Sequence, residues 1–592
     1  MEVWFNYGAQ ILIFAVLAVS LNLLLGYAGQ VSVAHAAFGA VGGYAMGYLV
    51  QVQHWNYLPA VVVGVLLAFI VGMIVALPAL KLSVEYLILL TLAVSSVILG
   101  ILVASKSLGG TYGLISINKI DIFGWHLTHK RDWLVPTGIG LLVIFSICWR
   151  IGESPYGRVL KGIREDGTVA QALGKNVFAY KVSVFALTSA MAGFGGALYS
   201  GLLGLATPGV YGFNFSLTIF AVVIFGGMAN LWGSVYGAVI IVLLDPFLQR
   251  VLKMKAERAF VVQLIVYGVA LTILMKVRPQ GLFPEGSKPL RRLLGRGTAG
   301  STTRVEMGED WVPDTNVTIR EADHEPTHSE QGVREDRWQH APVVLQARGI
   351  SKNFGGIVAA EDLDIDLRKG TITALVGPNG AGKTTVFNLL TGFIRPDTGS
   401  VVLNGQELVG RTPDAVARMG LVRTFQDVRL VQRVSCLSNV MLAVQEQPGE
   451  HLVPLFTPGS IAARGEEETR EKAMGWLRFV GMADFADLPA GALSYGQSKL
   501  LSLARVLATE ADVLLLDEPA SGIDTKWVDT MLDLIEAVRE QGRTVCIVEH
   551  NLHVVGRLAD HTYFMELGRI TAQGTIDELT SSERLAEAYF GT

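Results

Sequence analysis

The chain has 592 residues, which is more than a single compact domain usually contains, so several domains are expected. Hydrophobic residues make up 51% of it, the mean hydropathy is +0.42 and the formal net charge is −4, a balance that excludes a strongly basic nucleic-acid-binding protein. Cys148, Cys436 and Cys546 lie far apart and match no metal-binding spacing, which fits a reducing compartment for the second half of the chain.

Residues 1–284 have the apolar composition of a membrane domain. A helix needs about 20 apolar residues to cross roughly 30 Å of hydrocarbon. Stretches that meet this condition occur about nine times, at 9–28, 33–52, 57–80, 84–104, 132–151, 180–206, 214–230, 233–250 and 259–277. The break at 229–237 is either a true loop or a re-entrant interruption.

Glycines and two polar side chains stand out within these stretches. The glycines are expected to let helices pack closely, although broken helices lining a solute path are an alternative. Asn22 and His35 lie at membrane depth, and we expect interhelical hydrogen bonds for both rather than solute binding.

A charged insert, SPYGRVLKGIRED at 154–166, separates two apolar runs. On a helix, Tyr156, Leu160 and Ile163 share one face, and Arg158, Lys161 and Glu165 lie on another. The insert is therefore either an amphipathic helix on the membrane surface or a helix that docks on a partner. Four crossings separate the 151–180 loop from residue 277, so parity places the insert on the side of the C-terminal domain. Its basic residues agree with a cytoplasmic loop, whereas those at 250–258 do not.

Residues 285–342 are polar, mixed in charge and poor in apolar residues, so they predict a flexible linker. Residues 343–592 then have the pattern of a soluble α/β domain.

The segment ALVGPNGAGKTTVFNLL at 374–390 predicts a strand, a glycine-rich loop and the start of a helix. Its G-x-x-x-x-G-K-T pattern suits phosphate binding, because backbone N–H groups wrap the phosphates at a helix N-terminus. Lys383 would reach the β- and γ-phosphates of ATP, and Thr384 would offer its hydroxyl to Mg²⁺. The predicted ATP-binding residues of this loop are Gly377, Pro378, Asn379, Gly380, Ala381, Gly382, Lys383, Thr384 and Thr385.

The segment DVLLLDEP at 512–519 predicts a buried strand that ends in two carboxylates. At the carboxyl end of a parallel strand they would lie beside the phosphates. Asp517 would then hold Mg²⁺, and Glu518 would act as general base on the attacking water.

LSYGQSK at 493–499 is a second pattern that suits phosphate binding, and nothing within a single domain needs a second such site. This combination of motifs resembles the ATPase domain of ABC transporters. The resemblance implies adenine stacking by Phe354, a catalytic role for His550, and ATP and Mg²⁺ contacts by Gln426. It also implies a signature that completes the partner's ATP site, formed by Ser494, Tyr495, Gly496 and Gln497 with Asp524. Two departures are Asn551, where the family usually has an acidic residue, and Ser498–Lys499, where it usually has glutamine followed by a basic residue.

The membrane half is similar to Liv-type importers of branched-chain amino acids. SLNLLLGYAGQVSVAHAAFGAVGGY at 20–44, YGRVLKGIRED at 156–166 and FGGMANLWG at 225–233 carry the resemblance. It implies a coupling helix near 154–174 that sits in a groove of an ATPase domain. The residues implied in coupling are Tyr156, Arg158, Leu160, Ile163 and Glu165.

The expected protein is a multi-domain chain, an α-helical polytopic membrane domain followed by an α/β P-loop ATPase. It would drive uptake of amino acids across the cell (inner) membrane with a cytoplasmic ATPase domain. Its partners would be a second permease, a second ATPase, an extracytoplasmic solute-binding protein and membrane lipid, but no nucleic acid. Uptake of urea, amides or aromatic acids is an alternative, and an exporter or an ATP-gated channel are others. Short spans argue against the exporter, and intact Glu518 and His550 argue against a gate that only binds ATP.

Overall fold

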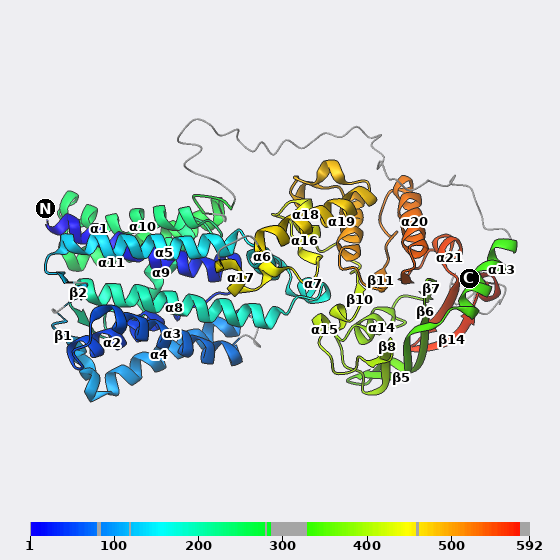
Figure 1. Ribbon diagram of the computed structural model, residues 1–592, viewed down its shortest axis with the longest axis horizontal. Coiled ribbons are helices and arrows are strands. Elements are labelled where there is room, and N and C mark those ends of the chain that lie inside the picture. The colour runs from blue at the N-terminus through cyan, green and yellow to red at the C-terminus, as the bar shows by residue number, and fades with distance from the viewer. Residues whose placement is uncertain are drawn as a thin grey trace. The chain divides into compact units, whose positions relative to one another are not determined.

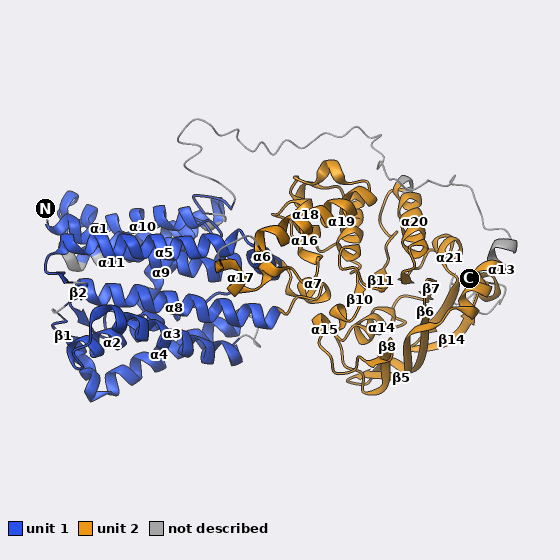
Figure 2. Ribbon diagram, in the orientation of Figure 1, with its two compact units in different colours: residues 1–164, 177–302 blue, residues 165–176, 303–592 orange. Residues whose placement is uncertain are grey.

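The computed structural model describes residues 2–79, 84–117, 120–122, 124–278, 281–285, 328–457 and 461–580. It divides into two compact units, coloured separately in Figure 2: residues 1–164 with 177–302, and residues 165–176 with 303–592. We call them unit 1 and unit 2. Unit 1 is almost wholly helical, and unit 2 combines two main sheets with helices (Figure 1). The predicted order, a helical domain followed by an α/β domain, is confirmed.

Each of the nine predicted apolar stretches contains a helix. These helices are α1 (Glu2–Asn22), α2 (His35–Gln51), α3 (Tyr57–Ala79), α4 (Val84–Ala104), α5 (Leu134–Gly152), α8 (Val177–Leu203), α9 (Phe213–Gly226), α10 (Leu231–Pro246) and α11 (Ala256–Val277). Among the described residues, 6 helical segments are long and apolar enough to cross a membrane, and they include α1, α3, α4, α5, α8 and α10. Because α2 and α9 are shorter and only Val261–Leu274 of α11 qualifies as a short apolar helix, crossing by these three stays a prediction.

Close packing through glycine is confirmed where α2 meets α8. A Cβ atom on Gly196 would lie 1.9 Å from the carbonyl oxygen of Gly39, and one on Gly42 would lie 2.1 Å from that of Gly193. Real carbon atoms do not approach oxygen so closely, so a side chain at either position would push the two helices apart. Small residues at these positions therefore set the separation of α2 and α8.

The two polar side chains at membrane depth make the hydrogen bonds expected of them. Asn22 Nδ2 donates to the carbonyls of Gly227 and Asn230 at 3.1 and 2.9 Å, and to Ser234 Oγ at 2.7 Å. Its Oδ1 accepts from the backbone N–H of Ala229 at 2.8 Å. His35 Nε2 lies 2.7 Å from Ser20 Oγ. Asn22 thereby fixes the break between α9 and α10.

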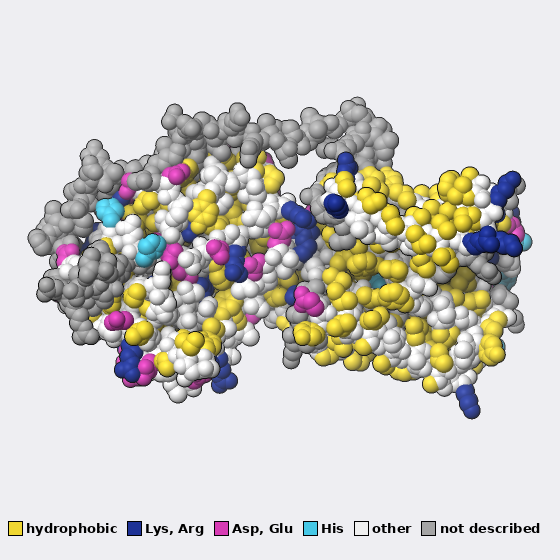
Figure 3. Space-filling model, turned by 180° about the vertical axis from the view of Figure 1, so that it is seen from behind, with side chains coloured by type: hydrophobic (Ala, Val, Ile, Leu, Met, Phe, Trp, Pro, Cys, Tyr) yellow, Lys and Arg dark blue, Asp and Glu magenta, His cyan; other side chains and the backbone are white. Residues whose placement is uncertain are grey.

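The surface of unit 1 suits hydrocarbon. Hydrophobic side chains cover much of it on the face shown in Figure 3, and charged side chains lie at its margins. On α3, Leu66, Ile70 and Ile74 are 55%, 47% and 62% exposed at helical spacing. A water-soluble surface would not carry such a stripe, whereas lipid or a neighbouring membrane helix would cover it.

Unit 2 is built on two sheets. The six-stranded sheet has the order β10 (Leu421–Arg423), β11 (Val513–Asp517), β12 (Thr544–Val548), β7 (Ile372–Val376), β13 (His561–Glu566), β14 (Arg569–Gly574). The four-stranded antiparallel sheet has the order β6 (Ile357–Arg368), β5 (Val343–Phe354), β8 (Thr398–Leu403), β9 (Gln406–Glu407). The helices are α14 (Lys383–Leu390), α15 (Pro413–Arg418), α16 (Cys436–Ala443), α17 (Leu452–Phe456), α18 (Ile461–Phe479), α19 (Tyr495–Leu507), α20 (Thr525–Glu540), α21 (Leu552–Leu558) and α22 (Ile576–Thr580).

The core of unit 2 lies between these sheets. Every residue of β7, β11 and β12 is buried, as expected of parallel strands covered on both faces. Leu345 and Val401 of the antiparallel sheet join Leu515 and Phe387 in one hydrophobic cluster. The continuous apolar runs in the sequence of unit 2 thus correspond to the buried strands β7, β11 and β12.

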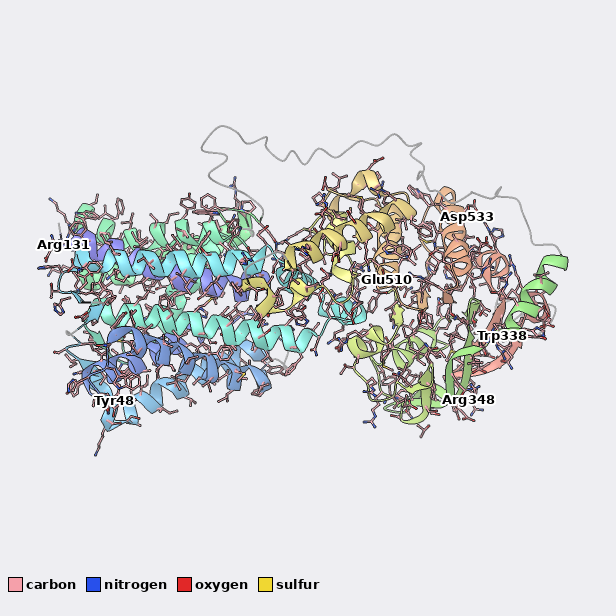
Figure 4. All side chains as sticks on the ribbon, in the orientation of Figure 1. Tyr48, Arg131, Trp338, Arg348, Glu510 and Asp533 are labelled. Atoms are coloured by element: carbon pink, nitrogen blue, oxygen red, sulfur yellow. The ribbon has the colours of Figure 1, made fainter. Side chains whose placement is uncertain are left out.

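The structure differs from the expectation at the end of the predicted linker. Residues 286–327 lie outside the described residues, but α13 (His328–His340) is a helix that packs on unit 2. Arg337 pairs with Asp560 at 3.0 Å, Trp338 stacks on His561 with ring centroids 3.7 Å apart, and Arg368 lies 4.4 Å over the Trp338 ring. Figure 4 labels Trp338 on this helix. The polar composition hid these contacts, because they are made with partners far along the chain. The folded ATPase unit thus begins before residue 343.

Trp338→Ala is expected to destabilise unit 2 by about 1–3 kcal/mol, since it removes a stacked, partly buried ring. Thermal inactivation of the ATPase activity of the full chain measures this. The control is Val333→Ala on the same helix, where the side chain is 61% exposed and little change is expected. Equal inactivation temperatures for Trp338→Ala and wild type would contradict a structural role for α13.

Candidate active site

Four neighbouring strands end at one edge of the six-stranded sheet. β10, β11, β12 and β7 pair in parallel, with Asp517 opposite Val548 and Val548 opposite Leu375. Their carboxyl ends lead into Gln426, Asp517–Glu518, His550 and the glycine-rich loop, respectively. Ligands of open parallel sheets bind at this edge, so the fold gathers four predicted groups that are far apart in sequence.

The glycine-rich loop needs glycine at two positions. Gly377 has φ +150° and a Cβ there would lie 2.0 Å from the Met565 carbonyl oxygen; Gly382 has φ +105° and a Cβ there would lie 2.3 Å from that of Ala359. Lys383 Nζ donates to the carbonyls of Gly377 and Pro378 at 2.7 and 2.9 Å, so the ammonium lies inside the loop. Burial lowers the pKa of Lys383, and the carboxylates of Glu518 and Asp517 oppose this.

The Glu518 carboxylate contacts two other side chains of this edge. Gln426 Nε2 donates to its Oε2 at 3.0 Å, and His550 Nδ1 lies 3.9 Å from its Oε1. The backbone of Glu518 has φ +47°, a left-handed conformation that costs a non-glycine residue roughly 1–2 kcal/mol. Such strain is typical of functional positions.

Asp517 is held by a buried ion pair. Arg423 Nη2 lies 3.1 Å from its Oδ2, and both side chains are only 2% exposed. Arg423 Nη1 also donates to Asn388 Oδ1 on α14 at 2.6 Å. Burial raises the pKa of Asp517, and the Arg423 guanidinium opposes this. The arginine thus joins β11 to the helix that follows the glycine-rich loop.

Arg423→Ala is expected to destabilise unit 2 by about 3–5 kcal/mol, because it leaves the Asp517 carboxylate buried without its partner. Thermal inactivation of the full chain checks the prediction. Arg348→Ala serves as the control, since its pair with Asp366 is more exposed, at 39% and 20%. If both variants lost the same stability, the buried pair would not be special.

Other predicted residues come from elements outside these four strands. Phe354 ends β5 in the other sheet and is 44% exposed. Ser494 caps α19, with its Oγ accepting from the N–H of Gln497 and its own N–H donating to Gln497 Oε1. Tyr495, one residue on, is 49% exposed, and Asp524 stands before α20. A cavity of about 510 Å³ adjoins Gly522, Glu549 and His550.

The predicted coupling insert is divided between the two units. α6 (Pro155–Glu165) belongs to unit 1 up to Arg164, and Tyr156 Oη there lies 2.6 Å from Ser183 Oγ of α8. Leu160 and Ile163 are buried and Arg158 is half-buried. Glu165 belongs to unit 2, where its Oε2 accepts from the backbone N–H of Gln432 at 3.2 Å.

Residues 165–176, here called the docking segment, carry contacts that the sequence did not reveal. The segment includes α7 (Gly167–Ala172), capped by Asp166 Oδ1, and Asp166 Oδ2 pairs with Arg429 at 3.2 Å. Arg418 Nη1 donates to the Gly174 carbonyl at 2.7 Å, and Gln445 Nε2 to that of Leu173 at 2.7 Å.

Lys175 makes a buried contact of the docking segment. Its Nζ lies 2.6 Å from Glu450 Oε1 and donates to the Val444 carbonyl at 2.8 Å, and the side chain is 2% exposed. The sequence indicated only a basic residue suited to a cytoplasmic loop. The one local signal was Gly174, whose φ of +81° marks a turn that presents Lys175.

Two family models match separate parts of this chain. The family described as "Branched-chain amino acid transport system / permease component" matches residues 3–275, and the family described as "ABC transporter" matches residues 360–521. The high-affinity branched-chain amino acid transport ATP-binding protein BraF of Pseudomonas aeruginosa is 35% identical over 42% of this chain and 98% of its own length. LivG of Escherichia coli is 34% identical over the same shares. A crystal structure of a nucleotide-free ATP-binding cassette from an ABC transporter is 32% identical, with a TM-score of 0.38, over 42% of this chain and 100% of that one.

The ATPase part is thus similar to BraF and LivG over nearly their whole lengths. The helical part matches a permease family, and its apolar helices make the chain a multi-pass membrane protein that assembles with other transporter subunits. The chain belongs to the ABC transporters, with a permease of the branched-chain amino acid transport family and an ATP-hydrolysing ABC domain fused in one polypeptide.

Proposed function

We propose that the chain drives uptake of small polar solutes, foremost branched-chain or other amino acids, as one fused subunit of a binding-protein-dependent importer. The observation that carries this is a branched-chain amino acid permease match over residues 3–275. The same chain contains the edge of the six-stranded sheet where Gln426, Asp517, Glu518, His550 and the glycine-rich loop meet, here called the nucleotide-site edge. The names of BraF and LivG support amino acids as the solute.

ATP hydrolysis would proceed at the edge of the six-stranded sheet. The glycine-rich loop binds the phosphates through its N–H groups, and Lys383 neutralises charge that develops on the γ-phosphate. Glu518 accepts a proton from the attacking water, while Gln426 and His550 orient its carboxylate and the water. Phe354, exposed at the end of β5, stacks on adenine.

Thr384, Gln426 and Asp517 fit a Mg²⁺ ion. They offer hydroxyl, amide and carboxylate oxygens, and Mg²⁺ bound with nucleotide needs only one or two protein carboxylates. Accordingly, the described residues contain no cluster of three His, Cys, Asp or Glu. When bound, Mg²⁺ would offset negative charge on the β- and γ-phosphates.

The partners follow from what one chain lacks. The signature at Ser494–Gln497, exposed at Ser494 and Tyr495, is suited to complete a site on a second ATPase subunit. A second permease would complete the translocation path, and an extracytoplasmic binding protein would deliver the solute. The permease would lie in the inner membrane, with the ATPase domain and the docking segment in the cytoplasm.

Uptake into liposomes by the chain co-purified with its partner subunits tests the proposal. Loaded binding protein should stimulate ATP-dependent uptake of labelled leucine, isoleucine or valine. Excess urea, acetamide or benzoate should not compete. If one of these three compounds competed and no amino acid were taken up, the solute would belong to the class of that compound and not to the amino acids. Solute movement only from the ATPase side would make the chain an exporter.

A further inference from the structure

Lys499 of the signature helix reaches into the nucleotide-site edge. It lies on α19, five residues after Ser494, and is only 6% exposed. Its Nζ donates to the backbone carbonyl of Glu518 at 2.8 Å and to that of Gln426 at 3.2 Å. The ammonium thus joins three segments that are separate in sequence: the signature helix, the loop after β10 and the end of β11.

These contacts bear on the strained residue of the site. The N–H of Glu518 donates to the Val548 carbonyl of β12 at 2.9 Å, and its carbonyl accepts from Lys499. Both peptide groups that flank the left-handed Cα are therefore held, while Gln426 Nε2 holds the carboxylate. Without the ammonium, the Glu518 carbonyl would lose a charge-assisted hydrogen bond, and φ +47° would lose one of its supports.

Charge complementarity supports the same placement. Burial lowers the pKa of Lys499, whereas the carboxylates of Glu549, Glu518, Asp517 and Asp427 oppose this. An ammonium in this position offsets repulsion among carboxylates that the site gathers in a small volume. A neutral side chain would remove this part of their compensation.

We propose that Lys499 is a positioning residue for ATP hydrolysis, which fixes the backbone of Glu518 and of Gln426 relative to the signature helix. The proposal rests on the role of Glu518 as general base. A shift of α19 would be transmitted through Lys499 to the carbonyl of Glu518, so the signature helix and the carboxylate of the same domain would move together. Lys499 touches neither the water nor the phosphates in this role.

Lys499→Met tests the proposal, in the assembled transporter with the partner's ATP site inactivated. The expected result is a kcat lower by about 10- to 100-fold, since small misplacements of a catalytic group have effects of this size. KM and the affinity for a fluorescent ATP analogue should change less than about twofold, because the phosphate loop is untouched. Lys499→Arg should restore most of kcat, since it keeps a cation with N–H donors.

The matched control is Lys472→Met on α18, whose side chain is 53% exposed and pairs with Glu510. It should leave kcat unchanged. A wild-type kcat for Lys499→Met would overturn the proposal, and so would equal losses in kcat, ATP affinity and thermal stability, which indicate a structural role alone. Glu518→Gln, measured in parallel, separates the two ideas. Full activity in that variant would show that Glu518 is not the general base. An inactive Glu518→Gln together with a normal Lys499→Met would overturn only the positioning role of Lys499.

Discussion

Glu518→Gln is expected to lower ATP hydrolysis at its own site by at least about 100-fold, while ATP still binds. The substitution keeps the size of the side chain and its hydrogen bond to Gln426 but removes the proton acceptor for the attacking water. Because the nucleotide is no longer consumed, we expect a long-lived ATP-bound assembly in which the signature of the partner ATPase covers the site. Single-turnover hydrolysis and retention of labelled ATP after gel filtration measure the two effects.

The partner's site must be inactivated for this measurement, since one active site can mask the loss of the other. Glu549→Gln is a useful comparison, because this neighbouring carboxylate is 1% exposed and accepts from the N–H of Ala520. It should retain hydrolysis if proton acceptance belongs to Glu518 alone. Hydrolysis at the wild-type rate by Glu518→Gln would show that another group activates the water.

The nucleotide-site edge could be predicted because its chemistry is local. Glycine is required at Gly377 and Gly382 by backbone φ and close carbonyls. Asp517 ends a fully buried strand, and Glu518 follows it. Such requirements act within a few residues, so they leave a pattern in the sequence. The membrane helices could be predicted for the same reason, since apolar length alone determines whether a helix can span hydrocarbon.

Contacts between distant segments could not be predicted from the sequence. Lys175 and Glu450 are 275 residues apart, and apart from the preceding Gly174 nothing local distinguishes Lys175 from any basic residue of a cytoplasmic loop. The helix α13 has a polar composition typical of a linker, and its stability depends on Asp560 and His561, more than two hundred residues further along the chain. Lys499 appeared only as part of the pair Ser498–Lys499, because its acceptors are backbone carbonyls, which have no sequence signal.

The contacts of the docking segment indicate more specifically than the amphipathic pattern at 154–166 which residues would transmit coupling. The apolar side chain of Tyr156 packs within unit 1, whereas Asp166, Gly174 and Lys175 make their contacts within unit 2. A substitution at Tyr156 would therefore disturb the fold of unit 1 as well as any coupling. Substitutions in residues 165–176 test transmission with less damage to the helices that hold the solute path.

Lys175→Ala is expected to abolish the stimulation of ATP hydrolysis by loaded binding protein, while basal hydrolysis remains within about twofold. The substitution removes the Lys175 ammonium from the Glu450 carboxylate, whose side chain is 11% exposed, and breaking a buried pair costs about 3–5 kcal/mol. It also removes a donor from the Val444 carbonyl, so the docking segment would lose its buried attachment to the loop after α16. The catalytic edge shares none of these contacts, which is why basal hydrolysis should survive.

Lys472→Ala is the matched control, because its pair with Glu510 is exposed and worth at most about 1 kcal/mol. The exchange Lys175→Glu with Glu450→Lys should restore part of the stimulation, since it keeps opposite charges at the two positions. Stimulation at the wild-type level in Lys175→Ala would show that the docking segment does not transmit the signal from the permease.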